Sequence, residues 1–443
     1  MNAQTAYDHT RHLVETFGPR PAGTTAMRKA GLYVADCLRR IGAEVEIHRF
    51  TVPVTALRSA SLTASFGGQA PVDLRHTPVW FAGGTGSQGV EAPVVYGGDG
   101  SRRYLDEARP QGKALVLSRD AYLYYPDDHL VEKLNEYDPA CVLFTCANIQ
   151  AGGPPEVYYN YITTQAHPAP PSTVISLEDA ERLVLSDGAS VRYVAQYEKG
   201  ESTCLNVVGT LRGSDPSLGS VLISTHADTT VTSPGAADDA GGVGVALALA
   251  EQYAQAARDG RRPRRTLHIA VWSGHESGLH GSKSFILDHP RLVEDLRMVV
   301  AFHVVGGAVG MDGLAITGDR VVSAGVQRIL AEKRLDSWLV VAGPAPLDVV
   351  NFYHAQIPTV TYGQALSPLV IRNHTPADDM ASLRVAAFAA PLEFGRAFLD
   401  WSLNVDELPP GYPPEVDQVC RDYATTFGWG LYGLTQAGPV ATR

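Results

Sequence analysis

The chain has 443 residues, 45% of them hydrophobic and 19% charged, which suffices for two or three domains or for one large domain with an insertion. This globular balance argues against a disordered or fibrous chain. A net charge of −11 and a single dense basic cluster, 261–265, argue against a nucleic-acid partner, and no apolar run approaches the roughly 20 residues that span a membrane.

The start of the chain and its cysteines predict a cytoplasmic location. Residues 1–17 carry charged side chains where a signal peptide would need an apolar segment. The five cysteines are odd in number and scattered, which is typical of reduced thiols rather than of a disulfide framework. Cys141 and Cys146 form either packed thiols or a metal-binding pair, and their spacing favours packed thiols.

The first 54 residues predict two helices and a strand. Residues 7–17 and 24–41 repeat apolar side chains at helical spacing, and the segment Gly18-Pro-Arg-Pro-Ala-Gly23 separates them. Residues 44–54 alternate apolar and charged side chains, which is typical of a strand.

The segment 56–199 predicts a smaller, inserted, strand-rich domain. Its short apolar runs are separated by clusters of Gly, Pro and Asp. The expected strands include 94–96, 114–117, 141–144 and 173–175.

From Cys204 onward, longer strands alternate with helices. Strands are expected at 221–225, 267–272, 298–304 and 359–362, and helices at 241–257, 282–287, 321–333 and 385–404. This alternation indicates an α/β fold with a mostly parallel sheet and helices on both faces. We therefore expect a discontinuous main domain, 1–55 and 200–405, around the inserted domain 56–199, followed by a C-terminal arm, 406–443.

The arm contains four prolines and then the aromatic run 427–432. Aromatic residues in such a segment either pack against the sheet or support self-association. A homo-oligomer is therefore one expectation for this chain.

Histidines and carboxylates follow several of the expected strands. Ligands of open α/β sheets bind at the carboxyl ends of the strands, so these side chains are expected to meet at one edge. Imidazole and carboxylate groups together suit Zn²⁺, and also Co²⁺, Mn²⁺ or Fe²⁺. The clusters are His226 with Asp228, Asp238 with Asp239, His275 with Glu276, His303, and His374 with Asp378 and Asp379.

Each cluster also has an ordinary structural explanation. Asp238 or Asp239 could cap the helix that follows, and a single histidine is commonly a hydrogen-bonded core residue. The chain has no nucleophile elbow, no phosphate-binding loop and no complete dinucleotide motif, which argues against a serine hydrolase, an ATPase and an NAD enzyme.

With these clusters, the sequence resembles the M28 family of zinc-dependent aminopeptidases, which also includes the glutaminyl cyclases. The resemblance covers residues 7–54 and 204–404. The segment between them, with 112–117 and 137–144, looks like the protease-associated domain that is often inserted there. The resemblance implies a zinc aminopeptidase-like fold and an enzyme with two zinc ions per chain.

The resemblance implies a role for each matching residue. His226 would bind the first zinc, and Asp228 would orient it. Asp238 would bridge both metals. Glu276 would bind the second zinc, and His374 would complete that site.

Two positions depart from the family pattern. His303 stands where the family usually has an aspartate ligand of the first zinc, and an imidazole can replace it. His275 stands where the family has the glutamate general base, and it would either move protons or reach a metal. Since two neutral side chains replace two carboxylates, we expect a substrate that lacks a free α-amine and carries a carboxylate or another electron-rich group, with Arg372 as its partner.

The sequence therefore predicts a metal-dependent hydrolase of a C–N amide bond in a small molecule or short peptide, with a metal-activated water. One alternative is a glutaminyl-cyclase-like acyltransferase with a single metal, which has no evident need for the ligands His226 and His303. The other is a non-catalytic, metal-stabilised binding protein on a peptidase fold. A binding protein has no evident need for a ligand at every metal position. The expected partner is the substrate, and neither a nucleic acid nor a membrane is expected.

Overall fold

The computed structural model describes residues 3–120, 128–146, 154–157, 169–335, 339–343, 347–364, 372–408 and 411. The chain divides into two compact units. The first contains 1–52, 202–373 and 378–443, and the second contains 53–201 and 374–377. Two strands of 22 residues each, β1 (Glu44–Ser65) and β8 (Ser190–Leu211), contribute to both units.

The sheet of the first unit has the strand order β13-β12-β14-β11-β9-β10-β8. Its centre is parallel: β9 pairs in parallel with β10 and β11, and β11 with β14. β8 and β12 pair antiparallel with β10 and β14. The strands are β9 (Ser220–His226), β10 (Thr266–Trp272), β11 (Leu296–His303), β12 (Gly313–Thr317), β13 (Leu339–Ala342) and β14 (Thr359–Gly363).

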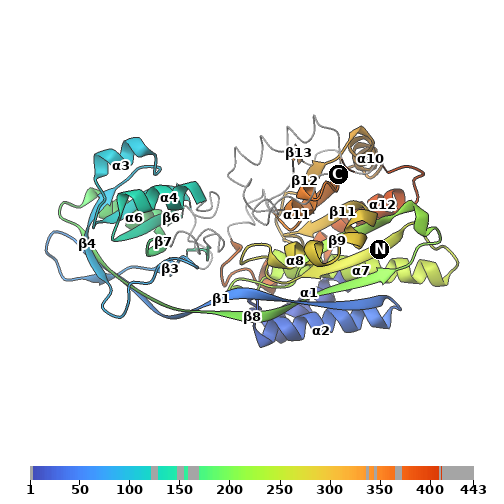
Figure 1. The fold of residues 1–443 in the computed structure, drawn as a ribbon, viewed down its shortest axis with the longest axis horizontal. Helices are drawn as coiled ribbons and strands as arrows, with labels where there is room; N and C mark the ends of the chain where they lie inside the picture. The colour runs from blue at the N-terminus through green and yellow to red at the C-terminus, as the bar shows by residue number, and fades with distance from the viewer. Residues whose placement is uncertain are drawn as a thin grey trace. The chain divides into compact units, whose positions relative to one another are not determined.

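Helices cover both faces of this sheet, as predicted (Figure 1). Successive residues of a strand point to opposite faces, so Val221 and Ile223 pack into one core and Leu222 into the other. The first face carries α1 (Ala3–Phe17), α2 (Thr25–Arg40), α7 (Gly242–Arg258), α10 (Arg320–Glu332) and α12 (Ala389–Ser402). The second carries α8 (His280–Asp288), α9 (Pro290–Asp295) and α11 (Val349–His354).

The predicted helix 385–404 is wrong over its first four residues. Val385–Phe388 form a short 3₁₀ helix, and the α-helix begins at Ala389. Pro391 has no N–H to donate and is accommodated only in the first turn of a helix. This residue therefore sets where α12 can begin.

Short 3₁₀ turns also occur at Pro216–Leu218 and Met380–Ser382, and an irregular helical turn, Ala236–Gly241, precedes α7. β8, β12 and β13 were not predicted. No helix of the described residues is long and apolar enough to cross a membrane. The aromatic run 427–432 lies outside the described residues, so self-association through the arm stays a prediction.

The second unit has its own sheet, in which β8 is followed by β4-β5-β6-β7-β3. β4 to β7 are parallel, and β8 and β3 flank them antiparallel. Cys141 and Cys146 are buried free thiols that pack into different cores. The elements are β2 (Val72–Asp73), β3 (His76–Pro78), β4 (Val90–Tyr96), α3 (Arg102–Ala108), β5 (Ala114–Asp120), α4 (Asp128–Tyr137), β6 (Cys141–Cys146), β7 (Ser172–Ser176) and α6 (Leu177–Leu185).

The described part of the inserted segment therefore contains the expected strands together with three helices that its short apolar runs did not predict. Its similarity to a protease-associated domain stays a prediction.

Candidate metal centre

Three of the predicted clusters meet because the strands before them are neighbours in a parallel sheet. His226 is the last residue of β9 and lies in register with Trp272, the last residue of β10. His275 follows three residues after Trp272, and His303 is the last residue of β11. The carboxyl ends of the three strands thus bring three imidazoles to one edge of the sheet.

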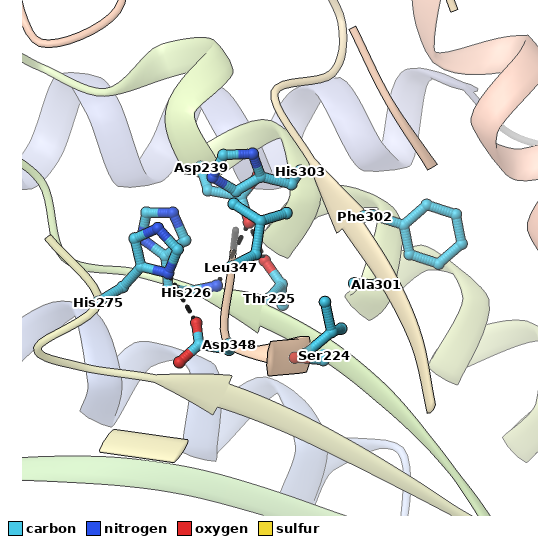
Figure 2. Close-up of a pocket in the computed structure, with 11 residues that line it drawn as sticks. Ser224, Thr225, His226, Asp239, His275, Ala301, Phe302, His303, Leu347 and Asp348 are labelled. Atoms are coloured by element: carbon cyan, nitrogen blue, oxygen red, sulfur yellow. Dashed lines mark hydrogen bonds and ion pairs between the residues drawn. The ribbon is translucent and has the colours of Figure 1, made fainter. Parts of the chain in front are cut away.

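The three histidines form one compact group. Ligand atoms of His226, His275 and His303 all lie within 4.8 Å of one another. The rings of His226 and His275 stack, with centroids 3.7 Å apart and planes 2° apart, and the His303 ring lies 5.2 and 5.3 Å from them. Figure 2 shows these side chains among the residues that line one pocket.

Asp238 faces this group from the turn before α7. Its Oδ1 lies 3.3 Å from Nε2 of His226 and 3.2 Å from Nε2 of His303, and the side chain is buried. Ligand atoms of Asp238 and Glu276 also lie within 4.8 Å of each other. Asp238 therefore contacts the first histidine group and forms a second group of donors with Glu276.

Asp239, the neighbour of Asp238, has a structural role. Its buried carboxylate accepts hydrogen bonds from the Thr225 hydroxyl and from the N–H groups of His226, Gly242 and Val304, the last three at 3.2 to 3.3 Å. Burial raises the pKa of Asp239, and the nearby histidines oppose this shift. The side chain ties the ends of β9 and β11 to the start of α7.

The carboxylate of Asp228 binds the loop after β10. Its two oxygens accept the N–H groups of His275 and Glu276, both at 3.2 Å. Nδ1 of His226 lies 3.0 Å from the backbone oxygen of Asp228 and 3.7 Å from its carboxylate. The backbone of Asp228 thus accounts for the orientation of His226 better than its side chain does.

Asp348 is a site residue that the sequence analysis missed. Its Oδ2 lies 2.7 Å from Nδ1 of His275 (Figure 2). Its Oδ1 accepts a hydrogen bond from the Ser282 hydroxyl. Burial opposes ionisation of this carboxyl, but the charge and hydrogen bond of His275 outweigh it, so the pKa of Asp348 is lowered. Asp348 directly precedes α11, where sequence alone suggests no more than a helix cap.

Arg20, in the Gly-Pro-Arg-Pro segment, was also missed. The side chain is fully buried, and burial lowers the pKa of its guanidinium to about 10. The guanidinium donates to the backbone oxygens of Ala227 at 2.9 Å, Pro234 at 2.8 Å and Gly235 at 3.2 Å. Arg20 therefore holds the two segments that lead from His226 to Asp238.

The remaining predicted residues follow β14. Nδ1 of His374 lies 2.8 Å from the backbone oxygen of Glu156, which leaves Nε2 as the nitrogen that can bind a metal. The Asp378 carboxylate accepts the N–H groups of Ala237 at 2.8 Å and Asp238 at 3.1 Å, and burial raises its pKa to about 7. Arg372 is partly buried, and its role toward substrate stays a prediction.

Residues 206–393 match the family model described as peptidase family M28. These residues form an M28 domain. This match confirms the resemblance found in the sequence. The mostly parallel α/β fold is confirmed as well. M28 is a family of zinc-dependent hydrolases.

Two curated relatives of the M28 domain have low sequence identity to this chain. Aminopeptidase YwaD of Bacillus subtilis is 26% identical over 69% of this chain and 62% of its own length. Carboxypeptidase Q of Homo sapiens is 25% identical over 74% of this chain and 70% of that protein. The match thus spans less than two thirds of the length of Aminopeptidase YwaD.

Solved structures share the fold across most of the chain. BSAP, a zinc aminopeptidase from Bacillus subtilis, has a TM-score of 0.71 at 20% identity, with 93% of this chain and 98% of that chain covered. A peptidase M28 precursor from Shewanella amazonensis has a TM-score of 0.76 at 21% identity, with 93% and 96% covered. At these identities the likeness shows a common fold.

The donor set of the M28 domain fits zinc. Nε2 of His226 and both ring nitrogens of His303 are buried and form no hydrogen bond with the described residues. A buried polar atom without a partner costs free energy, so such atoms call for a ligand. Imidazole nitrogens beside carboxylate oxygens are the ligands that zinc sites use.

Proposed function

We propose that this protein is a metal-dependent hydrolase that cleaves a C–N amide bond in a small molecule or short peptide. One observation carries the proposal: the buried group of His226, His275 and His303 at the carboxyl edge of an M28 domain, with the Asp238 carboxylate against it. The relatives named aminopeptidase and carboxypeptidase support the same reaction class.

The residues would divide the work as follows. His226 and His303 with Asp238 would hold one zinc ion, and Asp238 with Glu276 a second, for which the family resemblance also assigns His374. His275, beside the first ion, would move protons or bind the metal. A bound zinc ion polarises a carbonyl and lowers the pKa of its water to near 7, about nine units below that of free water. Asp239 and Arg20 keep the segments that carry His226 and Asp238 in place through their buried hydrogen bonds.

Apolar side chains line the pocket beside the histidines. They include Ala301, Phe302, Leu347 and Val349. We propose that an apolar part of the substrate packs against these side chains at the mouth of the pocket.

The proposed substrate lacks a free α-ammonium group. A carboxylate near the metals would attract an ammonium group, and this chain has neutral imidazoles at His275 and His303 instead. An anionic group of the substrate would be favoured in the same place, with Arg372 as its partner.

The test compares one amide in two forms, N-acylated and with a free α-amine, on the zinc-loaded protein. We expect at least about ten-fold faster hydrolysis of the N-acylated form, equivalent to about 1.4 kcal/mol. Faster turnover of the free amine would contradict the substrate class. A cyclised product would identify the acyltransferase alternative, and a zinc-loaded protein inactive on a broad amide panel would identify the binding protein.

Two variants test the assignment of the site. His374→Ala should abolish most hydrolysis, because the family resemblance assigns His374 to the second metal. His12→Ala is its matched control, because His12 is an exposed histidine on α1 that belongs to neither group. Equal activity of both variants would count against a role for the second group.

A further inference from the structure

The imidazole of His275 is held from one side by a buried chain of hydrogen bonds. Its Nδ1 lies 2.7 Å from Oδ2 of Asp348, which is 3% exposed. The other oxygen of Asp348 accepts the hydroxyl of Ser282, whose oxygen in turn accepts Nδ2 of Asn351 at 2.8 Å. An ionised carboxylate can only accept, so Nδ1 of His275 carries a proton, and Nε2 is the nitrogen that can bind a metal once it has no proton.

The other side of the same ring belongs to the histidine group. The ring of His275 lies parallel to that of His226, with centroids 3.7 Å apart, and its centroid lies 5.3 Å from that of His303. A metal binds near the plane of an imidazole ring, so one of the two parallel rings must turn for both to bind one ion. One ligand nitrogen of each histidine lies within 4.8 Å of the others. Nδ1 of His275 is hydrogen-bonded to Asp348, so Nε2 is the nitrogen available to bind a metal together with His226 and His303.

We propose that His275 is a third imidazole ligand of the first metal site, not a general base, and that Asp348 is the residue that positions it. This inference rests on the metal centre of the proposed function. Metal-binding histidines commonly donate their second ring N–H to a carboxylate, which fixes the tautomer and raises the basicity of the ligand nitrogen. The pair His275 and Asp348 has this arrangement.

The surrounding residues support a fixed ligand rather than a mobile proton carrier. Asp228 anchors the backbone N–H of His275, and Asn351 donates to the backbone oxygen of Leu279 at 3.2 Å in the same loop. Ser282 is fully buried on α8, and Asp348 directly precedes α11. The position of the ring is thus fixed by Asp348, which precedes α11 and is bound by Ser282 of α8. The hydrogen bond from the backbone N–H of His275 to Asp228 fixes it as well.

The test measures metal binding, so it does not depend on a substrate. Zinc content and zinc affinity of the full-length protein are determined by elemental analysis and by competition with a chromophoric chelator. Visible absorption of the cobalt-substituted protein then reports the ligand geometry of the sites. The variants are His275→Ala, His275→Gln and Asp348→Asn. The control is His280→Ala, at the first residue of α8 and outside both donor groups.

We expect both His275 variants to lose one bound metal and to change the cobalt spectrum, while His280→Ala keeps both properties. Asp348→Asn should keep the stoichiometry at saturating zinc but bind about 10- to 100-fold more weakly. Thermal unfolding in chelator shows whether each variant is folded. If His275→Ala does not fold, the less disruptive His275→Gln still provides the test.

Three results would overturn the inference. A His275→Gln protein with unchanged zinc affinity and cobalt spectrum but lost hydrolysis would make His275 a base, and the proposed hydrolase would stand. Unchanged zinc affinity in Asp348→Asn would remove the positioning role. Metal loss in His280→Ala as well would assign the effect to the fold of the loop. Failure of the unaltered protein to bind zinc would instead overturn the proposed function itself.

Discussion

Asp228 holds Glu276 through the backbone: the N–H of Glu276 donates to Oδ2 of Asp228 at 3.2 Å, across 48 residues of sequence. The neighbouring N–H of His275 donates to Oδ1 at the same distance. Asp228 is fully buried, so no solvent competes for these bonds. One carboxylate just after β9 thus fixes the backbone of the loop that carries two candidate ligands.

Replacement of Asp228 by alanine should therefore damage both stability and metal binding. Two partly buried N–H groups would lose their acceptor, at roughly 1–3 kcal/mol each, so the free energy of unfolding should fall by about 2–6 kcal/mol. Urea denaturation in chelator measures the first effect and zinc titration the second. Asp8→Ala is the control, because Asp8 forms an exposed ion pair with Arg11 on α1. Equal stability of the two variants would contradict the role of Asp228.

A methyl group at Gly242 should disturb the anchor of the metal centre. A Cβ at this position would lie 2.3 Å from Oδ1 of Asp239 and 2.4 Å from the backbone oxygen of Phe302. Gly242→Ala should lower the free energy of unfolding by about 1–3 kcal/mol and weaken zinc binding. Gly200→Ala is the matched control, since a Cβ there meets nothing within 4 Å. Unfolding curves that coincide for the two variants would show that Asp239 can move without cost.

Arg20 should be essential for stability even though it touches no candidate ligand. Arg20→Met would leave the backbone oxygens of Ala227, Pro234 and Gly235 without their buried donor, and we expect a loss of at least about 3 kcal/mol. The exposed Arg11 provides the control, and Arg11→Met should change stability by no more than about 0.5 kcal/mol. Differential scanning calorimetry on the metal-free proteins decides between these outcomes.

Stability should fall in mild acid because of His268. Burial lowers the pKa of His268 from 6.5 to about 4, so the folded protein keeps it neutral where the unfolded chain takes up a proton. The unfolded state then binds more protons between pH 6.5 and 4, and stability decreases as pH falls through this window, by about 2 kcal/mol from pH 7 to pH 5. His268→Gln keeps a partner for Thr210 and should lose about 2 kcal/mol less than the unaltered protein over the same range. If the free energies of unfolding of the variant and the unaltered protein fell equally with pH, as measured by urea denaturation, this explanation would be refuted.

Much of the metal centre could be predicted because strand ends are visible in the sequence. His226 and His303 terminate buried apolar runs, and Glu276 follows a third run by four residues. Parallel neighbours bring such positions together without any knowledge of side-chain packing. The predicted strands at 221–225 and 298–304 were accordingly close to β9 and β11.

The residues that hold this centre could not be predicted in the same way. Arg20 and Asp348 lie in segments with ordinary explanations, a break between two helices and the start of α11. Their roles come from contacts with residues that are far away in sequence: 207 residues separate Arg20 from Ala227, and 73 separate His275 from Asp348. No local pattern encodes such a pair.

The sequence by itself determined the α/β alternation and the edge of the sheet where metal-binding side chains collect, because hydrophobic periodicity and strand ends are local properties. Only the tertiary structure decided that His275 joins His226 and His303 while its other nitrogen faces Asp348. That outcome depends on the packing of α8 and α11 on the same face of the sheet, which places Ser282 and Asp348 within hydrogen-bonding distance. Burial makes this arrangement specific, since a buried imidazole must find partners for both of its nitrogens.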